Sequence, residues 1–432
     1  MKNFYFMMAV CCLMLSCSSS EDDADLGNDE KVVNMLPKTK PISLTPEQRV
    51  FVQDNNQFTL SFLKTVNETE RSGKGFIYSP LSITYVLGMV NDAATGLTEK
   101  ELEETLGFHE GGIQAVNEYC KKLIDGLPKA DQNVTLNIAN AIFLNKDFTL
   151  KPQFQQDMQT YYDAKAEALD FRAPETLDHI NGWCSEKTNG MVPSILNDVD
   201  PSMVSYLLNA IYFKANWTSK FDENNTRNED FTTPNGTVQL PMMHQNVLIN
   251  YLKNSTYSAI KMPYGSGVWN MVIMMPEEGK TVNDIIDHLM TFGIYPVAYD
   301  DIGENLNAGV FSPYEVDVKL PRYETSSDTN DLAGGLVGLM QKMGINRAFH
   351  AGLAEIPNMA NTSVYISMMR QKAKIKVNEK GAETAAVTVA GGDSAFATEY
   401  PKATFHANHP FIYVITEAST GVILFVGKFT GA

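Results

Sequence analysis

Cysteine is scarce in this chain of 432 residues, and most of it lies at the N-terminus. Of the five cysteines, Cys11, Cys12 and Cys17 fall within the first 17 residues, so that only Cys120 and Cys184 remain for the body of the protein. Two thiols so far apart in the sequence are expected to be buried and free, with a disulfide as the alternative. The stability of the protein must then come from its core and not from a disulfide framework.

Positive charge is also in short supply. Lys and Arg together number 34 against 51 Asp and Glu, which gives a formal net charge of −17. A surface of this sign repels a polyphosphate, and this argues against nucleic-acid binding. Hydrophobic residues make up 44% and charged residues 20%, as is ordinary for a globular protein with a large core.

Catalytic motifs are absent as well. The sequence contains neither a Gly-x-Ser-x-Gly elbow nor a Gly-x-x-x-x-Gly-Lys-Ser/Thr phosphate loop. The seven histidines are scattered; His406 and His409 lie three apart, but no carboxylate or cysteine stands at ligand spacing beside them. We therefore expect no enzyme activity, no metal and no cofactor.

The first 17 residues form a targeting segment. Lys2 supplies a positive charge, and the apolar run over residues 4–15 is about 12 residues long, too short for a helix that spans a membrane. The run closes with Met14-Leu15-Ser16-Cys17, which resembles a bacterial lipoprotein signal in which Cys17 is lipidated and becomes the new N-terminus. An ordinary cleaved signal peptide is the alternative.

Residues 18–44 are expected to be a disordered tether, because they begin with serines and acidic residues and offer little to bury. Such a tether is similar to the export signal of surface lipoproteins in some Gram-negative bacteria. We therefore expect an exported protein that a lipid anchors in the outer membrane, facing either the periplasm or the cell surface.

The body of the chain shows helical patterns first and strand patterns last. Folding is expected to begin at Thr45-Pro46-Glu47-Gln48, a capping box with proline at the first helical position. Further helical spacing follows Ser79-Pro80 and recurs over residues 177–184 and 331–343. Strand patterns occur at residues 134–138, 203–213, 259–262, 271–275, 316–320, 411–416 and 422–429. Without βαβ alternation or internal repeats, this order predicts an α+β fold in one large domain, residues 45–432.

The stretch from Val377 to Pro410 has an unusual composition. For about 14 residues after Glu379 it carries no large apolar side chain, so it cannot anchor itself in a core. Small residues nevertheless recur there at every second position, which is typical of a strand that can slip between two existing strands. They are Ala382, Thr384, Ala386, Thr388 and Ala390. The stretch looks like an exposed loop that could also become a central strand; a plain surface loop is the alternative.

Motifs in this region resemble those of the serpin family of protease inhibitors. Glu379-x-Gly381-x-Glu383-x-Ala385-Ala386 is similar to the hinge of the serpin reactive-centre loop, and Phe405-x-Ala407-Asn408-His409-Pro410-Phe411-Ile412-Tyr413 fits the family signature. Similar motifs run through the chain at residues 76–83, 209–217, 320–323 and 343–349. The resemblance covers the whole of residues 45–432.

The resemblance implies the serpin fold, which has a main β-sheet, further sheets, surrounding helices and an exposed reactive-centre loop, here at about residues 380–404. It also implies a mechanism: a protease attacks the loop and forms an acyl-enzyme, and the cut loop then inserts into the main sheet and traps the protease. About 14 inserted residues would move roughly 45 Å. At about 1 kcal/mol for each new ladder bond, insertion gains on the order of 10 kcal/mol, so the uncut form is held kinetically.

The hinge spacing places the scissile bond at Ala395–Phe396, to within one or two residues. Ala before the bond suits elastase-like proteases, and Phe in that place suits chymotrypsin- or subtilisin-like proteases. Trypsin-like targets are disfavoured because Lys380 and Lys402 lie too far away, whereas a papain-like cysteine protease is compatible. The protein is expected to act as a monomer, with proteases and the membrane as its partners.

Three groups of residues receive roles from the resemblance. The hinge, which needs small side chains to insert, comprises Glu379, Gly381, Ala382, Glu383, Thr384, Ala385 and Ala386. The polar "shutter" beneath the opening sheet comprises Ser79, Ser82, Asn209 and Gln371, where Gln371 replaces the histidine usual in the family. The "breach" at which insertion begins comprises Trp217, Arg322 and Glu379. An alternative explanation of Arg322 and Glu379 is an ordinary surface ion pair, which contributes less than about 1 kcal/mol to stability.

Two other functions are compatible with the sequence. A non-inhibitory serpin would act as a carrier or chaperone and form no gel-stable complex with a protease. A surface lipoprotein that binds a ligand would hold a small molecule tightly and gain no heat resistance when the loop is cut.

Overall fold

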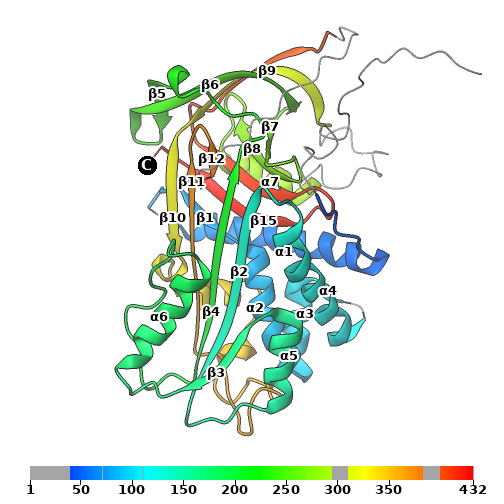
Figure 1. Ribbon diagram of the computed structural model, residues 1–432, viewed down its shortest axis with the longest axis vertical. Coiled ribbons are helices and arrows are strands. Elements are labelled where there is room, and N and C mark those ends of the chain that lie inside the picture. Colours follow the sequence, from blue (N-terminus) through cyan, green and yellow to red (C-terminus); the bar gives the residue numbers. More distant parts are fainter. Residues whose placement is uncertain (1–38, 71, 110, 294–309, 383–398, 432) are drawn as a thin grey trace, which may run out of the picture. The chain divides into compact units, whose positions relative to one another are not determined.

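The computed structural model describes residues 39–70, 72–109, 111–293, 310–382 and 399–431 (Figure 1). The chain divides into two units after Pro37, and the first unit lies outside the described residues, as do the signal segment, Cys17 and most of the tether. Predictions for those parts stay predictions. Among the described residues, no helix combines the length and the apolar character that crossing a bilayer requires.

Eight α-helices occur in the described part of the chain. They are α1 (Pro46–Thr69), α2 (Pro80–Ala93), α3 (Gly96–Leu106), α4 (Gly112–Gly126), α5 (Pro152–Tyr162), α6 (Glu175–Lys187), α7 (Val282–Phe292) and α8 (Gly335–Lys342). The capping box expected at Thr45 is present: the Gln48 amide donates to Thr45 Oγ1 at 3.2 Å, and the Thr45 amide donates to Gln48 Oε1 at 3.1 Å. The helix expected from Asp331 begins four residues later, because a 3-10 turn occupies Thr329–Asp331 and Gly334 is left-handed with φ of +83°.

The main sheet has six strands and is mixed. Its order is β10 (Tyr323–Asp328), β11 (Met368–Val377), β4 (Ser205–Asn216), β2 (Val134–Asn145) and β3 (Lys165–Leu169), and the short β12 (Gly381–Ala382) also pairs with β4. Strand β11 runs parallel to β4, whereas β2 and β12 run antiparallel to it. Figure 1 shows β4 and β2 as the long central strands.

The second sheet has nine strands and gathers the C-terminal part of the chain. Its order is β1 (Phe76–Tyr78), β15 (Ile423–Phe429), β14 (Phe411–Glu417), β8 (Trp269–Pro276), β7 (Tyr257–Tyr264), β6 (Gly236–Lys253), β9 (Ser312–Pro321) and β13 (Lys402–His406), with β5 (Arg227–Thr233) paired to β6. The predicted α+β fold with a main sheet and a further sheet is confirmed.

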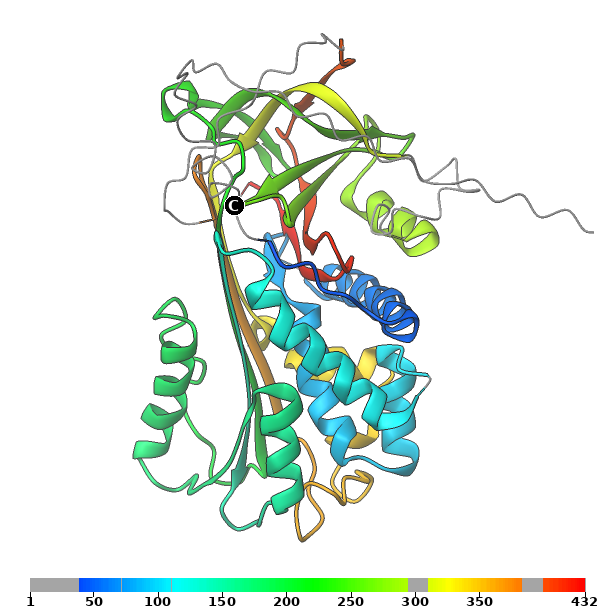
Figure 2. The same ribbon diagram turned by 45° about the vertical axis from the view of Figure 1, so that its right-hand side comes forward.

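Separate hydrophobic clusters cover the two faces of the main sheet. Helix α6 packs on one face, where Trp183 and Ile180 meet Phe143 and Tyr206 of the sheet. Helices α1 to α5 lie on the other side (Figure 2), within the larger core that also holds the second sheet. Because side chains alternate along a strand, neighbouring residues of β4 and β11 point into different clusters.

Both remaining cysteines are buried and free, as the sequence indicates. Cys120 lies in the larger core and Cys184 in the cluster beneath α6. Burial raises the pKa of each thiol to about 12, so neither is a reactive thiolate at neutral pH.

The folded domain starts earlier than residue 45. Thr39 forms an isolated bridge with Asp131, and the Lys40 amide donates to the Ala130 carbonyl at 2.9 Å. Ile42 is buried in the larger core, and its amide donates to Ser419 Oγ at 3.0 Å. Residues 39–44 of the expected tether thus contact the folded domain, because Ile42 is buried in the core and Leu44 packs against it, whereas residues 18–38 lie outside the described residues.

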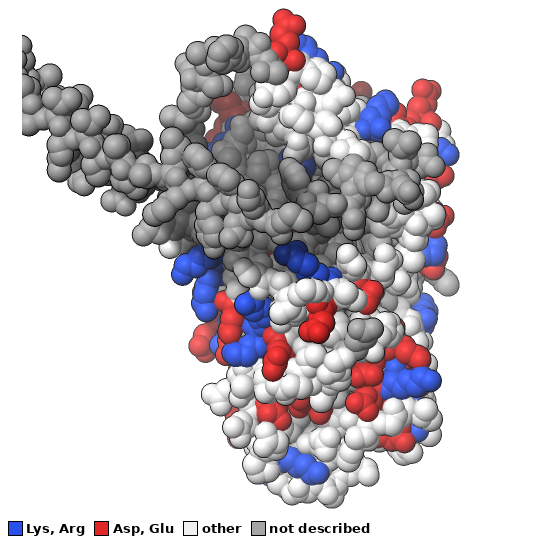
Figure 3. Space-filling view, turned by 90° about the vertical axis from the view of Figure 1, so that its right-hand side faces the viewer, with Lys and Arg blue, Asp and Glu red and all other residues white. Residues whose placement is uncertain are grey.

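On the face shown in Figure 3, basic and acidic side chains are interspersed, and the described residues form no continuous basic surface there. The described residues also contain no group of three or more His, Cys, Asp or Glu arranged to hold a metal ion. His406 Nε2 lies 3.0 Å from Asp317 Oδ2, whereas His409 Nε2 lies 3.1 Å from the Pro276 carbonyl, so the two histidines serve separate contacts.

Candidate functional site

The hinge begins in a tight turn at the end of β11. The amides of Asn378 and Gly381 each donate to the other's carbonyl at 3.1 Å, and the Lys380 amide donates to Asn378 Oδ1 at 2.9 Å. The turn sends the chain back along β4 as β12. Asparagine at the first position of a turn and glycine at the fourth are a known turn signal, so the role of Asn378, absent from the sequence-based site, was open to prediction.

Gly381 lies in close contact with β4. Its φ is +129°, and a Cβ atom here would stand 2.4 Å from the Ala215 carbonyl oxygen and 2.5 Å from the Asn216 Cα. Both contacts are to backbone, which cannot move away as a flexible side chain can. Only glycine fits this position with the chain this close to β4.

Glu379 is the buried acid of this turn. Its carboxylate accepts hydrogen bonds from Arg322 Nε at 3.1 Å and from Thr226 Oγ1 at 2.6 Å. The side chain of Glu379 is 5% exposed and that of Arg322 is 45% exposed. The pair is therefore half-buried and differs from an ordinary surface ion pair, which was the alternative explanation. Burial alone raises the pKa of Glu379, but the hydrogen bonds from Arg322 and Thr226 outweigh it and lower that pKa below its usual value.

Trp217 completes the breach. Its ring stacks on Tyr264 with centroids 4.2 Å apart, and its indole Nε1 donates to the Asn378 carbonyl at 2.9 Å. The Trp217 amide donates to the Lys380 carbonyl at 2.9 Å. The structure therefore brings together Trp217, Arg322 and Glu379, the three residues that the sequence assigned to the breach, and adds Thr226 and Asn378.

Below the turn, β4 and β11 part from each other. Their parallel ladder runs from Met368 opposite Tyr206 to Lys372 opposite Ala210, and it ends there. Further along β4, its partner on this side is β12, with Ala382 opposite Ala215 and Gly381 opposite Asn216. The main sheet is thus joined at the lower part of β4 and β11 and open above it, with the first two residues of a further strand at the top of the gap (Figure 1). We call this region the β4–β11 gap.

The shutter lies behind the part of β4 and β11 that is still paired, below the gap. Gln371 on β11 donates from Nε2 to Asn209 Oδ1 on β4 at 3.1 Å and to the Ser79 carbonyl at 2.9 Å. Its Oε1 accepts from the Ser79 amide at 2.9 Å, and Ser79 Oγ donates to Ser82 Oγ at 3.0 Å. These four residues are at most 2% exposed. An amide that donates twice and accepts once can fill the place that the family gives to histidine.

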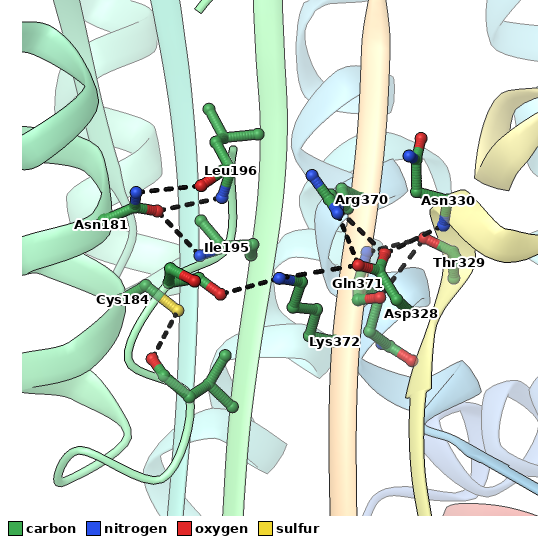
Figure 4. A network of polar contacts seen from close by, with 12 residues as sticks. Asn181, Cys184, Ile195, Leu196, Asp328, Thr329, Asn330, Arg370, Gln371 and Lys372 are labelled. Carbon is green, nitrogen blue, oxygen red and sulfur yellow. Dashed lines mark hydrogen bonds and ion pairs between the residues drawn. The ribbon is translucent and has the colours of Figure 1, made fainter. Parts of the chain in front are cut away.

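Two further members of the shutter were not predicted from the sequence. Asn140 on β2 accepts at Oδ1 from Asn209 Nδ2 at 2.9 Å, and Thr329 Oγ1 accepts from the backbone amide of Gln371 at 3.0 Å (Figure 4). Neither residue stands in a recognisable motif, because each acquires its partner only when strands far apart in sequence come together. Together they extend the polar network across β2, β4 and β11.

The remaining predicted site residues lie outside the described residues. They are Glu383, Thr384, Ala385, Ala386, Ala395 and Phe396. Their roles in the hinge and at the scissile bond stay predictions.

Comparison with known proteins gives a uniform result. The family model described as "Serpin (serine protease inhibitor)" matches residues 53–431. Serpin B6 of Macaca fascicularis is 29% identical over 88% of this chain and 99% of its own length, and leukocyte elastase inhibitor A of Rattus norvegicus is 29% identical over 87% and 97%. A solved structure of human thyroxine-binding globulin is 25% identical, with a TM-score of 0.74, and covers 88% of this chain and 98% of that one.

Proposed function

The chain belongs to the serpin family, and we propose that it inhibits serine endopeptidases as a suicide substrate. A target protease cuts the reactive-centre loop, and the freed loop enters the β4–β11 gap as a new strand with the protease still attached as an acyl-enzyme. The observation that carries this proposal is the pairing of Gly381 and Ala382 with β4 at the top of the gap.

The direction of β12 supports the proposal. Since β11 runs parallel to β4 and β12 antiparallel to β4, a strand that continued from Ala382 would run antiparallel to both neighbours. It would fill the ladder positions of both strands, which is the more stable arrangement for each of them. The hinge therefore stands in the register and direction that insertion needs.

The register of β12 also supports the choice of small side chains. Ala382 is opposite Ala215, which packs in the larger core. Directly opposed residues of antiparallel strands share a face, so residues 384 and 386 would follow to the core side and residue 383 to the other. These positions hold Thr384, Ala386 and Glu383, so only small side chains would enter the core and the charge would stay outside it.

The breach and the shutter supply the barrier that holds the uncut form. Insertion has to separate β11 from β4, and it therefore breaks the Gln371–Asn209 hydrogen bond and the five ladder positions from Met368 to Lys372. Each buried hydrogen bond contributes about 1 kcal/mol to stability, so the paired part of β4 and β11 resists separation before the loop is cut. Insertion of the cut loop then replaces these bonds with a longer ladder on both strands.

We propose elastase-, chymotrypsin- or subtilisin-like enzymes as the targets, because the predicted bond is Ala395–Phe396. A papain-like cysteine protease also forms an acyl-enzyme and is compatible with the same loop. The name of leukocyte elastase inhibitor A describes a relative that inhibits an elastase, which supports the first of these classes.

Incubation with a panel of elastase-, chymotrypsin-, subtilisin-, trypsin- and papain-like proteases tests the proposal. We expect a denaturant-resistant complex with at least one enzyme of the first three classes, and mass spectrometry of the released C-terminal peptide should place the cut within two residues of Ala395. Protease with its nucleophile blocked is the control, since it binds but cannot acylate. Cleavage by every enzyme without a complex would instead indicate a non-inhibitory carrier or chaperone.

We further propose that lipid on Cys17 anchors the protein to a membrane, as the lipoprotein-type signal suggests. In a Gram-negative host, the full chain should fractionate with the outer membrane and incorporate labelled fatty acid. Cys17→Ser should abolish the labelling and move the protein to the soluble fraction, while Cys12→Ser serves as the matched control. Labelling that persists in the Cys17 variant would contradict the anchor.

A further inference from the structure

The part of the chain that the structure describes begins at Thr39, beside the residues that lead into β2. Thr39 forms an isolated bridge with Asp131, and the Lys40 amide donates to the Ala130 carbonyl at 2.9 Å. Strand β2 begins three residues after Asp131, at Val134, whose amide donates to the Asp131 carbonyl at 3.2 Å. The part of the predicted tether that precedes Thr39 therefore joins the domain at this end of β2.

The same end of the main sheet holds the hinge. Val134 of β2 pairs with Ala215 of β4, and Ala382 of β12 pairs with Ala215 from the other side. Val134 and Ala382 are thus two strand spacings apart, which is about 10 Å. We call the end of the main sheet that contains Val134, Ala215 and Ala382 the hinge end. Strands β2 and β4 run side by side away from it (Figure 1).

A second set of contacts fixes the tether's point of attachment to the hinge end. Asp131, which is 1% exposed, accepts from the Ser266 amide at 2.6 Å and from Ser266 Oγ at 3.0 Å. The amide of the neighbouring Gly265 donates to the Asn216 carbonyl at 2.8 Å, and Asn216 pairs with Gly381 of the hinge. Because a buried carboxylate is costly to leave without partners, these contacts hold Asp131, and with it the start of the domain, beside the hinge.

The register of β12 shows where the cut end of the loop would finish. A strand that continued from Ala382 in this register would bring Ala395 opposite Ser202, just before β4 starts. That is the end of β4 away from the tether, and the travel is roughly 45 Å at strand spacing. A flexible chain of about 20 residues, like the tether predicted before Thr39, spans only roughly 25 Å. The protease would therefore travel further than the tether reaches.

We propose that the tether holds the hinge end of the domain next to the membrane, so that loop insertion carries a trapped protease away from the membrane. The inference rests on the proposed function, both on the lipid anchor and on loop insertion. It also describes the partner more closely: the target is a protease that acts near the membrane surface, where the tether keeps the uncut loop. An anchor at the other end of the sheet would bring the trapped protease to the membrane instead.

The test compares two anchors on the mature chain, residues 18–432. A maleimide lipid on Ser18→Cys reproduces the natural position of the anchor. The same lipid on Thr149→Cys is the matched control, because Thr149 is exposed in the turn that follows β2, at the end of the sheet opposite the hinge end. Cys120 and Cys184 are buried and burial raises the pKa of each to about 12, so only the new cysteine reacts. Each protein is bound to vesicles whose bilayer carries an energy-transfer acceptor.

A donor dye on the protease reports its distance from the bilayer. Protease with a blocked nucleophile gives the value for the encounter complex, and active protease gives the value for the trapped complex. With the Ser18 anchor, energy transfer should fall at least about twofold on trapping, since the protease moves away by roughly 45 Å; with the Thr149 anchor it should rise. Changes of the same sign with both anchors, or no change with the Ser18 anchor, would overturn the inference. If the protein forms no covalent complex in solution, the proposed inhibition fails, and if Cys17 takes up no fatty acid, the proposed anchor fails.

Discussion

Cutting the reactive-centre loop near Ala395 should raise the melting temperature of the protein by on the order of 10 °C or more. The cut frees the tract that follows Ala382, and we expect this tract to fill the β4–β11 gap as a strand paired on both sides. About 14 residues at about 1 kcal/mol for each new ladder bond stabilise the inserted form by on the order of 10 kcal/mol. Few single events in a folded protein change stability in this direction, because a cut normally adds freedom to the chain.

Differential scanning calorimetry before and after limited proteolysis measures this effect. The two fragments should stay associated, and only protein cut in the loop should show the higher transition. Protein incubated with an inactivated protease is the control. Melting of the cut protein at the temperature of the uncut protein would contradict the central mechanism, and a surface lipoprotein that merely binds a ligand would behave in that way.

Thr384→Arg should convert the inhibitor into a substrate. Residue 384 follows Ala382 to the core side of the inserted strand, since Ala382 stands opposite the buried Ala215. An unpaired guanidinium driven into the core costs several kcal/mol, and each 1.36 kcal/mol slows a step tenfold. Insertion would then be slower than hydrolysis of the acyl-enzyme, and we expect the number of serpin molecules consumed for each protease blocked to rise at least about 100-fold.

Titration of the protease with each variant, followed by gel analysis, measures this ratio. Glu383→Arg is the matched control, because residue 383 would point to the other face of the inserted strand. Its charge would therefore stay in solvent both before and after insertion. The control should keep a ratio within a few-fold of the wild type. If Thr384→Arg still traps protease as efficiently as Glu383→Arg does, insertion in this register does not occur.

Much of the fold could be predicted from the sequence, because its helices and strands depend on local patterns. The capping box at Thr45, the alternation of Val134 and Leu136 and the apolar run after Met203 each predict an element that the structure contains. Element boundaries were less certain. Helix α8 begins at Gly335 and not at Asp331, and the domain includes Ile42, since both limits depend on tertiary contacts and not on periodicity.

The candidate site was predictable where a motif carried it. Glu379, Arg322 and Trp217 stand in recognisable motifs, and the structure brings them together at the breach. Asn140 and Thr329 could not be found in this way. Each is an ordinary residue in its own strand or turn, and it gains a role only from a partner on an element distant in sequence.

The sequence by itself determined the family, the α+β class and the strand-like composition of the tract after Gly381. These follow from short motifs and from side-chain periods of two and of three to four residues, which are properties of the chain alone. Only the tertiary structure decided where β4 and β11 separate, that Ala382 pairs with Ala215, and that Gln371 binds Asn209. The physical reason is that pairing register and hydrogen-bond partners depend on the distance between atoms, and Asn209 and Gln371, 162 residues apart in the sequence, acquire that distance only when the main sheet has formed.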